Sequence, residues 1–235
     1  LLAFPGCCVT LIQGQNGFLT AALAGLSIRL MERRPRLAGI LIGLMIIKPH
    51  LAVLFPISLI ASRSWKTLGI AAITAVGFTV LSSHVLGWET FKTFMDNLHI
   101  ARTLIEGGGL IQNKMPSVFV TLRRAGLPIN LAWLAHGLLG ALVALTVFRT
   151  WKTSVSLPLK GAILMTASLL TTHYLYDYDL AWLAFPILWV IKSGCQSGWL
   201  PMERITCFLA WYLPILVLPL AKLTEWPVAP FLLGL

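Results

Sequence analysis

The sequence predicts an all-α protein, a polytopic transmembrane helical bundle that forms a single domain over residues 1–235. Hydrophobic residues make up 57% of the 235, only 11% are charged, and the mean hydropathy is +0.84. A soluble domain could not bury so much apolar surface, whereas a bilayer accommodates it. Short basic turns also separate the apolar runs, a pattern that orients helices in membranes.

The formal net charge of +10 does not indicate a nucleic-acid-binding protein. The 18 Lys and Arg residues are spread through the loops between apolar runs, so they are expected to orient the chain and contact lipid headgroups instead of forming one basic surface. The cysteines have neither metal-ligand spacing nor a paired framework, and we interpret them as small apolar residues. No metal or cofactor is expected. The four cysteines are Cys7, Cys8, Cys195 and Cys207.

The first 28 residues are uncharged and are interrupted by Gln13-Gly14-Gln15-Asn16-Gly17. Glycines flanking amide side chains favour a turn, so we expect an incoming segment, this turn, and a helix over about residues 17–31. The amides of Gln15 and Asn16 could hydrogen-bond a sugar or a phosphate. They could equally serve only to cap and turn the chain, and the sequence leaves both interpretations open.

Two basic turns, at residues 32–36 and 62–66, are expected on the cytoplasmic side. Residues 37–61 between them could form one kinked span or two short helices that meet at Lys48-Pro49-His50. We favour the helix hairpin, because it places both basic turns on the same side. Each half would rise about 16–18 Å, so the tip of the hairpin should stop within the outer half of the membrane.

Lys48 is the lone cation of this hairpin, since no other charged residue lies between Arg36 and Arg63. An ionisable group at such depth costs about 2.5–3.5 kcal/mol on insertion scales and usually faces a cavity, a partner or a ligand. We therefore predict a binding site at Lys48, with His50 beside it. The alternative is that Lys48 only extends from a helix end to the membrane interface.

Residues 67–86 form a clear span, and residues 87–127 form a long loop that we expect on the extracytoplasmic side. The first half of the loop has apolar residues at helical spacing, which predicts an amphipathic helix on the membrane surface. Gly107-Gly108-Gly109 should end this helix, and a second short helix should open at 113–117 and close at 123–126. The residues at helical spacing are Trp88, Phe91, Met95, Leu98, Arg102 and Ile105.

Further spans are expected over residues 128–148, 161–172, 180–191 and 205–221, with the polar segment 173–179 on the outer side. His173 and Asp177 are four residues apart and would share a face if the helix continues, while Asp179 points elsewhere. This carboxylate and imidazole could act as a general base or orient a substrate hydroxyl. Lys48 and Lys114 could neutralise a phosphate. The alternative is a polar interfacial turn with an aromatic belt.

Four polar regions are predicted on the extracytoplasmic face, which favours a composite site: residues 14–17, residues 48–50, the long loop and residues 173–179. Together with the basic turn at 32–35, they form an ordered series over roughly residues 10–185. This series resembles glycosyltransferase family 87, the polyprenyl-phosphate-mannose-dependent mannosyltransferases of the GT-C architecture. The residues that carry this resemblance are Gly14-Gln15-Asn16-Gly17, Glu32-Arg33-Arg34-Pro35, Ile47-Lys48-Pro49-His50, Gly107-Gly108-Gly109, Lys114-Met115-Pro116-Ser117 and His173-Tyr174-Leu175-Tyr176-Asp177.

The resemblance implies a multi-pass enzyme of the bacterial plasma membrane that needs no metal or cofactor. It would transfer a sugar, commonly mannose, with inversion from a polyprenyl-phosphate donor to a lipid or glycan hydroxyl on the extracytoplasmic face. The usual general base is a carboxylate in the first outer loop, which we expect to precede residue 1 in an N-terminally truncated chain. The expected substrate-binding residues are Gln15, Asn16, Lys48, His50, Lys114, His173, Tyr176 and Asp177.

Two other function classes remain open at this point. A transporter or lipid permease would explain polar residues at membrane depth and a broken helix pair, but it predicts an internal repeat. The long loop has no counterpart in the second half of the chain. A noncatalytic membrane subunit is the other class.

Overall fold

The computed structural model describes residues 3–107 and 112–224, and this part of the chain is helical without strands, as predicted. Gly108 and Gly109 of the predicted glycine stop lie outside the described residues. The α-helices are α1 (Pro5–Ile12), α2 (Gly17–Leu30), α3 (Pro35–Leu44), α4 (Pro49–Ala52), α5 (Leu54–Ala61), α6 (Trp65–Leu86), α7 (Trp88–Gly107), α8 (Val118–Arg124), α9 (Ile129–Trp151), α10 (Leu157–Thr171), α11 (Ala184–Ser197) and α12 (Glu203–Thr224); the 3-10 turns are η1 (Met45–Ile47), η2 (Gln112–Lys114) and η3 (Asp177–Leu183).

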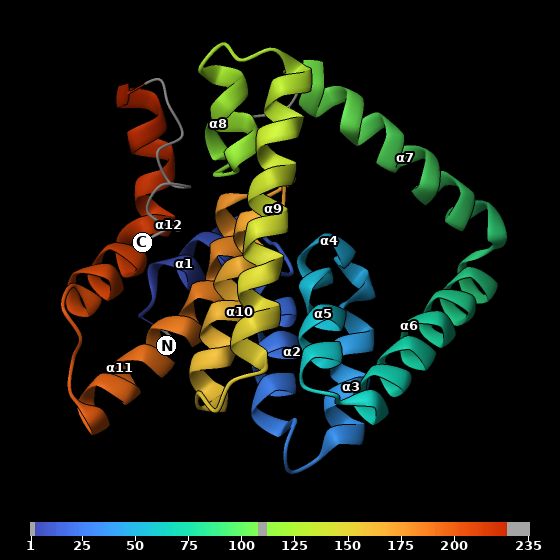
Figure 1. Cartoon of the computed structure of the whole chain (residues 1–235). Coiled ribbons are helices and arrows are strands. Elements are labelled where there is room, and N and C mark those ends of the chain that lie inside the picture. Colours follow the sequence, from blue (N-terminus) through green and yellow to red (C-terminus); the bar gives the residue numbers. More distant parts are fainter. Residues whose placement is uncertain (1–2, 108–111, 225–235) are drawn as a thin grey trace.

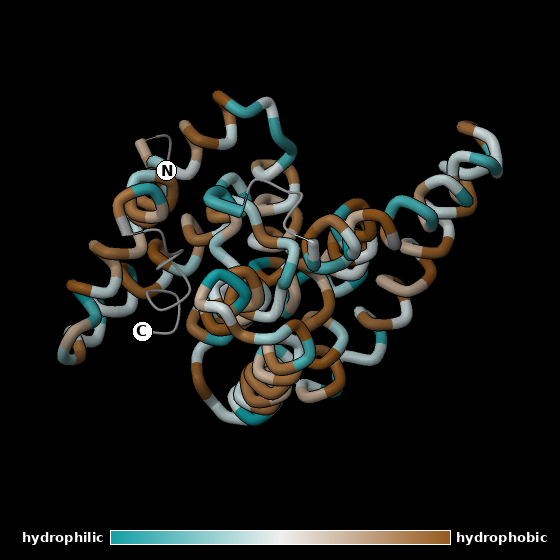
Figure 2. The backbone as a smooth tube through the Cα atoms, turned by 90° about the horizontal axis from the view of Figure 1, so that it is seen from above, coloured by the Kyte–Doolittle hydropathy of each residue, from teal (hydrophilic) through white to brown (hydrophobic). Residues whose placement is uncertain are grey.

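Helices α6, α9 and α12 are each long and apolar enough to cross a membrane. Large apolar side chains on all three helices are strongly exposed: Ile73 by 74%, Leu138 by 63% and Phe208 by 62%. Hydrophobic stretches run along peripheral as well as central helices in Figure 2. Such surfaces are stable in hydrocarbon and not in water, so the structure supports an integral membrane protein.

The predicted helix hairpin over residues 37–61 is confirmed, and a single kinked span is excluded. Helix α3 rises from one basic turn, η1 and α4 form the tip, and α5 returns to the other basic turn at the same end of the bundle (Figure 1). Lys48 lies outside the helical region, with φ −138° and ψ 71°, and Pro49 begins α4. A residue before proline is driven out of the helical region, and proline suits the first position of a helix.

Two glycines explain how closely α3 packs against α6. Gly39 and Gly43 lie four residues apart on one buried face of α3. A Cβ added at Gly43 would lie 2.6 Å from the Ala71 carbonyl oxygen, and one at Gly39 would lie 2.8 Å from that of Thr67. Small residues at this spacing let the backbones of membrane helices approach one another.

Replacing Gly43 by alanine is therefore expected to destabilise the protein by about 1–3 kcal/mol, since backbone must shift to admit the methyl group. The matched control is Gly77→Ala on α6, where an added Cβ meets nothing within 4 Å. Alanine stabilises a helix by about 0.5–1 kcal/mol relative to glycine at such a position. Thermal unfolding in detergent measures both variants. A Gly43→Ala protein as stable as Gly77→Ala would contradict the close packing.

The long loop contains the predicted helices. Helix α7 projects from the end of α6 and returns over the bundle at its far end (Figure 1), where Ile105 packs with Phe119 and Ala132. Helix α8 begins as predicted, with the Ser117 hydroxyl accepting a hydrogen bond from the Val120 amide. The surface position of α7 and the extracytoplasmic side of the loop stay predictions.

Candidate active site

The segment 173–179, here called the tyrosine segment, does not continue helix α10. Thr172 is already extended, with φ −88° and ψ 116°, and Tyr176 is extended as well. The helix does not continue past Thr171, so His173 and Asp177 do not share a helix face. Aromatic residues that alternate with others favour extended backbone, in which successive side chains point to opposite sides. The next helix begins only at Ala184, after the 3-10 turn η3.

Burial alternates along the tyrosine segment and defines an inner row and an outer row of side chains. Leu175, Asp177 and Asp179 form the buried inner row, whereas Tyr174, Tyr176 and Tyr178 are half-buried. The rings of Tyr176 and Tyr178 stack at 5.3 Å with an interplanar angle of 4°. The segment thus turns two carboxylates into the protein and leaves an aromatic row on its other side.

Lys48 reaches the inner row from the hairpin tip. Its Nζ lies 2.6 Å from Asp179 Oδ1, and the two side chains are only 13% and 2% exposed. The ammonium also lies 4.7 Å from the centre of the Tyr178 ring, and the Tyr176 amide donates to Asp179 Oδ2 at 3.3 Å. Lys48 therefore points into the protein, where it is held by an ion pair with Asp179.

Asp177 is bound from the turn between α1 and α2. Gln13 Nε2 donates to both carboxylate oxygens, at 3.0 and 3.1 Å, and the Tyr178 amide donates to Oδ1 at 2.9 Å. Burial raises the pKa of the Asp177 carboxyl, while these hydrogen bonds and the positive charge of Lys114 oppose the rise. The predicted amides Gln15 and Asn16 are exposed on the same turn.

Helix α1 and the start of α2 also contact the tyrosine segment directly. Thr10 Oγ1 donates to the Tyr178 carbonyl oxygen at 2.9 Å, and a Cβ added at Gly17 would lie 2.8 Å from that oxygen. Because glycine has no Cβ, residue 17 can lie this close to the tyrosine segment. Packing alone therefore accounts for this glycine, and no ligand is needed to explain it.

Two predicted histidines, His50 and His173, lie at the start of the tyrosine segment and have different neighbours. The His50 ring meets Tyr174 edge-on at 6.0 Å, and its Nε2 is buried without a hydrogen-bond partner among the described residues. His173 packs instead against Trp133, at 5.2 Å, and His136, at 6.2 Å. Burial lowers the pKa of His173.

Gln13 and Asp179 are the two residues of the cluster that sequence reasoning missed as site residues. Asp179 lies two residues after Asp177 within the 3-10 turn η3, and the helical spacing from His173 did not include it. Gln13 had no signal either, since nothing in the sequence ranks it above Gln15.

Comparison with models of protein families identifies a family for this chain. The model of glycosyltransferase family 87 matches residues 1–175. The chain belongs to glycosyltransferase family 87. No curated protein and no solved structure matches it. The matched range includes the α1–α2 turn, the hairpin tip and the first half of the tyrosine segment; Asp177 and Asp179 follow it.

In this family-87 glycosyltransferase the cluster brings together a lysine, two carboxylates and a side-chain amide. These groups can hydrogen-bond polar parts of a substrate. Lysine can donate three hydrogen bonds, and one direct bond from Lys48 goes to Asp179. Within residues 3–107 and 112–224, no group of three or more His, Cys, Asp or Glu side chains is placed to bind a metal ion. The cluster is suited to binding phosphate and hydroxyl groups through hydrogen bonds and charge.

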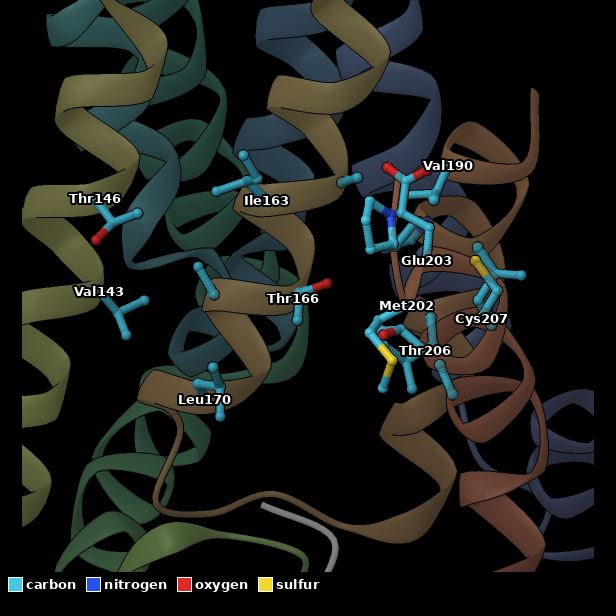
Figure 3. A pocket seen from close by; sticks show the side chains of 17 residues that line it. Val143, Thr146, Ile163, Thr166, Leu170, Val190, Met202, Glu203, Thr206 and Cys207 are labelled. Atoms are coloured by element: carbon cyan, nitrogen blue, oxygen red, sulfur yellow. The ribbon is translucent and has the colours of Figure 1, made fainter. Parts of the chain in front are cut away.

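A separate apolar groove of about 460 Å³ lies on another side of this glycosyltransferase, between α9 and α10 on one wall and α11 and α12 on the other (Figure 3). None of the predicted site residues lines it. Its charged lining residue is Glu203, whose carboxylate accepts from the Leu200 amide at 2.8 Å. The groove therefore lies apart from the polar cluster.

Proposed function

We propose that this family-87 protein transfers a sugar, mannose in the first instance, from a polyprenyl-phosphate donor to a hydroxyl of a lipid or glycan. The reaction would take place on the extracytoplasmic face of the membrane and would invert the anomeric centre. The proposed substrate-binding residues are Gln15, Asn16, Lys48, His50, Lys114, His173, Tyr176 and Asp177.

The observation that supports this proposal is the pairing at the hairpin tip. Lys48 is held by Asp179 at 2.6 Å with 13% of its side chain exposed, and two of its three N–H groups remain for another acceptor. The buried Nε2 of His50, two residues away, has no partner among the described residues. An unsatisfied buried polar group costs about 1–3 kcal/mol, so a ligand that hydrogen-bonds there would be favoured.

In this assignment the leaving polyprenyl phosphate takes the electron pair of the bond to the sugar, and its negative charge develops beside Lys48. Because the site is shielded from water, that attraction is stronger than it would be at an exposed position. Family membership favours this transferase over a permease or a noncatalytic subunit.

The test uses membrane vesicles that contain the protein expressed from its complete gene. Three labelled donors are compared: polyprenyl-phosphate mannose, polyprenyl-phosphate glucose and a nucleotide-activated mannose. We expect label in lipid or glycan products from the polyprenyl-phosphate mannose and at most a trace from the nucleotide sugar. Transfer only from the nucleotide sugar would overturn the donor class. Donor movement across the vesicle without sugar transfer would support a permease.

A further inference from the structure

A polar pocket of about 260 Å³ lies at the end of the bundle opposite the hairpin tip. It is formed by the α2–α3, α5–α6 and α9–α10 turns, which lie toward the lower end of the molecule in Figure 1. Helix α3 alone rises about 15 Å between this end and the tip, so the pocket is separate from the polar cluster at Lys48. We call it the end pocket; the residues lining it are Met31, Glu32, Ser62, Ser64, Trp151, Val155, Leu157 and Lys160.

The end pocket lies where two candidate membrane spans end. Helices α6 and α9 are both long and apolar enough to cross a membrane. Ser64 immediately precedes α6, and Trp151 is the last residue of α9. Because the apolar length of each span stops at the pocket, the pocket is expected at the depth where phospholipid headgroups meet the hydrocarbon.

A buried hydrogen-bond donor of the end pocket has no acceptor. Trp151 is only 3% exposed, and its Nε1 has no hydrogen-bond partner among the described residues. An indole N–H can only donate, and a buried tryptophan usually finds a partner. Lys160 is half-buried beside it; its Nζ donates to the Thr153 carbonyl oxygen at 2.7 Å, which leaves two N–H groups for another acceptor. Both side chains therefore favour a ligand that brings acceptor oxygens.

The charges around the end pocket favour an anion. A smaller cavity of about 140 Å³ shares Glu32 and Leu157 with it and adds Arg29 and Arg33 to its lining. The two cavities together thus have three cationic side chains, including Lys160, and one carboxylate. Arginine and lysine side chains are the usual partners of phosphate oxygens. The Glu32 carboxylate is exposed and can accept from a hydroxyl of a headgroup.

We propose that the end pocket binds the phosphate of an anionic phospholipid headgroup. Trp151 Nε1 and Lys160 Nζ would donate to the phosphate oxygens, and Met31, Val155 and Leu157 would contact the apolar part of the lipid. Basic pockets between membrane helices bind such headgroups. The position at the ends of two spans favours a bilayer lipid over a free phosphate compound, because lipid phosphates are concentrated at that depth. A bound lipid would link three turns and stabilise the fold.

The test measures lipid binding to the complete protein by native mass spectrometry, with phosphatidylglycerol, phosphatidylcholine and the soluble headgroup analogue glycerol 3-phosphate as probes. Trp151→Phe removes the indole N–H and keeps an aromatic ring, and Lys160→Gln removes the ammonium. The matched control is Lys192→Gln, which removes the same charge from an exposed position on α11 that lines neither cavity.

We expect the wild type to bind phosphatidylglycerol at least about tenfold more tightly than phosphatidylcholine. Trp151→Phe and Lys160→Gln should each weaken the binding of phosphatidylglycerol by about tenfold, the effect of losing one hydrogen bond to a charged group, and Lys192→Gln should leave it unchanged. Equal binding of the two lipids, or an equal loss in Lys192→Gln, would overturn the inference. Glycerol 3-phosphate binding as tightly as phosphatidylglycerol would assign the pocket to soluble phosphates and overturn the lipid.

A second measurement is insensitive to the stability of each variant. The rise in unfolding temperature on adding phosphatidylglycerol is compared with the same variant without it, in detergent. A ligand that binds only the folded state raises this temperature in proportion to its occupancy. We expect a clear rise in the wild type and in Lys192→Gln, and a much smaller one in Trp151→Phe and Lys160→Gln. The same rise in all four proteins would contradict a site at the end pocket.

Discussion

Lys48→Met is expected to lower kcat for sugar transfer by about 10²–10³-fold, the loss typical when one group that stabilises a developing oxyanion is removed. Methionine has a similar length and fits an apolar setting, but it offers neither charge nor N–H groups to a phosphate. Initial rates with saturating polyprenyl-phosphate mannose, normalised to the amount of inserted protein, measure the effect.

This loss must be separated from a loss of folding, because Lys48→Met leaves the buried Asp179 carboxylate without its ion-pair partner. The double variant Lys48→Met/Asp179→Leu removes both charges, and replacing a buried ion pair by apolar side chains is often neutral or stabilising. We expect it to unfold at a temperature close to that of the wild type while staying as inactive as Lys48→Met. Wild-type activity in the folded double variant would exclude a role for Lys48 at the phosphate.

Asp179→Ala is expected to destabilise the protein by about 3–5 kcal/mol, because it leaves the Lys48 ammonium unpaired in a setting where little of it is exposed. For a chain of this length such a change lowers the unfolding midpoint by roughly 10 °C. Differential scanning fluorimetry in detergent measures this shift.

Asp179→Asn is the conservative comparison, since its single amide oxygen can still accept from Lys48, while an NH₂ group replaces the oxygen that accepts from the Tyr176 amide. It should unfold between the wild type and Asp179→Ala. If all three proteins unfolded at the same temperature, the ion pair would contribute nothing to stability, and Asp179 would not be what holds Lys48 in place.

Much of the fold could be predicted from local patterns. The apolar runs predicted membrane helices, and the two basic turns predicted a hairpin because a single span would have separated them. Ser117 and Gly126 marked the ends of α8. These features depend on short-range causes: hydrophobic transfer, loss of helical backbone before proline, and capping of free amide groups.

The partners within the candidate site could not be predicted in the same way. Lys48 was singled out by its isolation, but its partner Asp179 is 131 positions away along the chain. Helical spacing associated His173 with Asp177, whereas α10 ends at Thr171, His173 packs against Trp133, and Asp177 accepts from Gln13. Whether the helix continues beyond Thr171 depends on packing on both sides of the chain, which no local pattern contains.

The sequence by itself determined that the chain is a helical membrane protein, that it turns at Lys48-Pro49-His50, and that its polar motifs follow the order of family 87. The tertiary structure alone decided that Lys48 pairs with Asp179, that Gln13 and not Gln15 holds Asp177, and that three turns form a polar pocket at the end of the bundle opposite the hairpin tip. The physical reason is the distance along the chain over which each interaction acts. Hydropathy, turns and caps act between near neighbours, whereas an ion pair and a pocket depend on how distant helices pack, and in α3 and α6 that packing depends on two glycines.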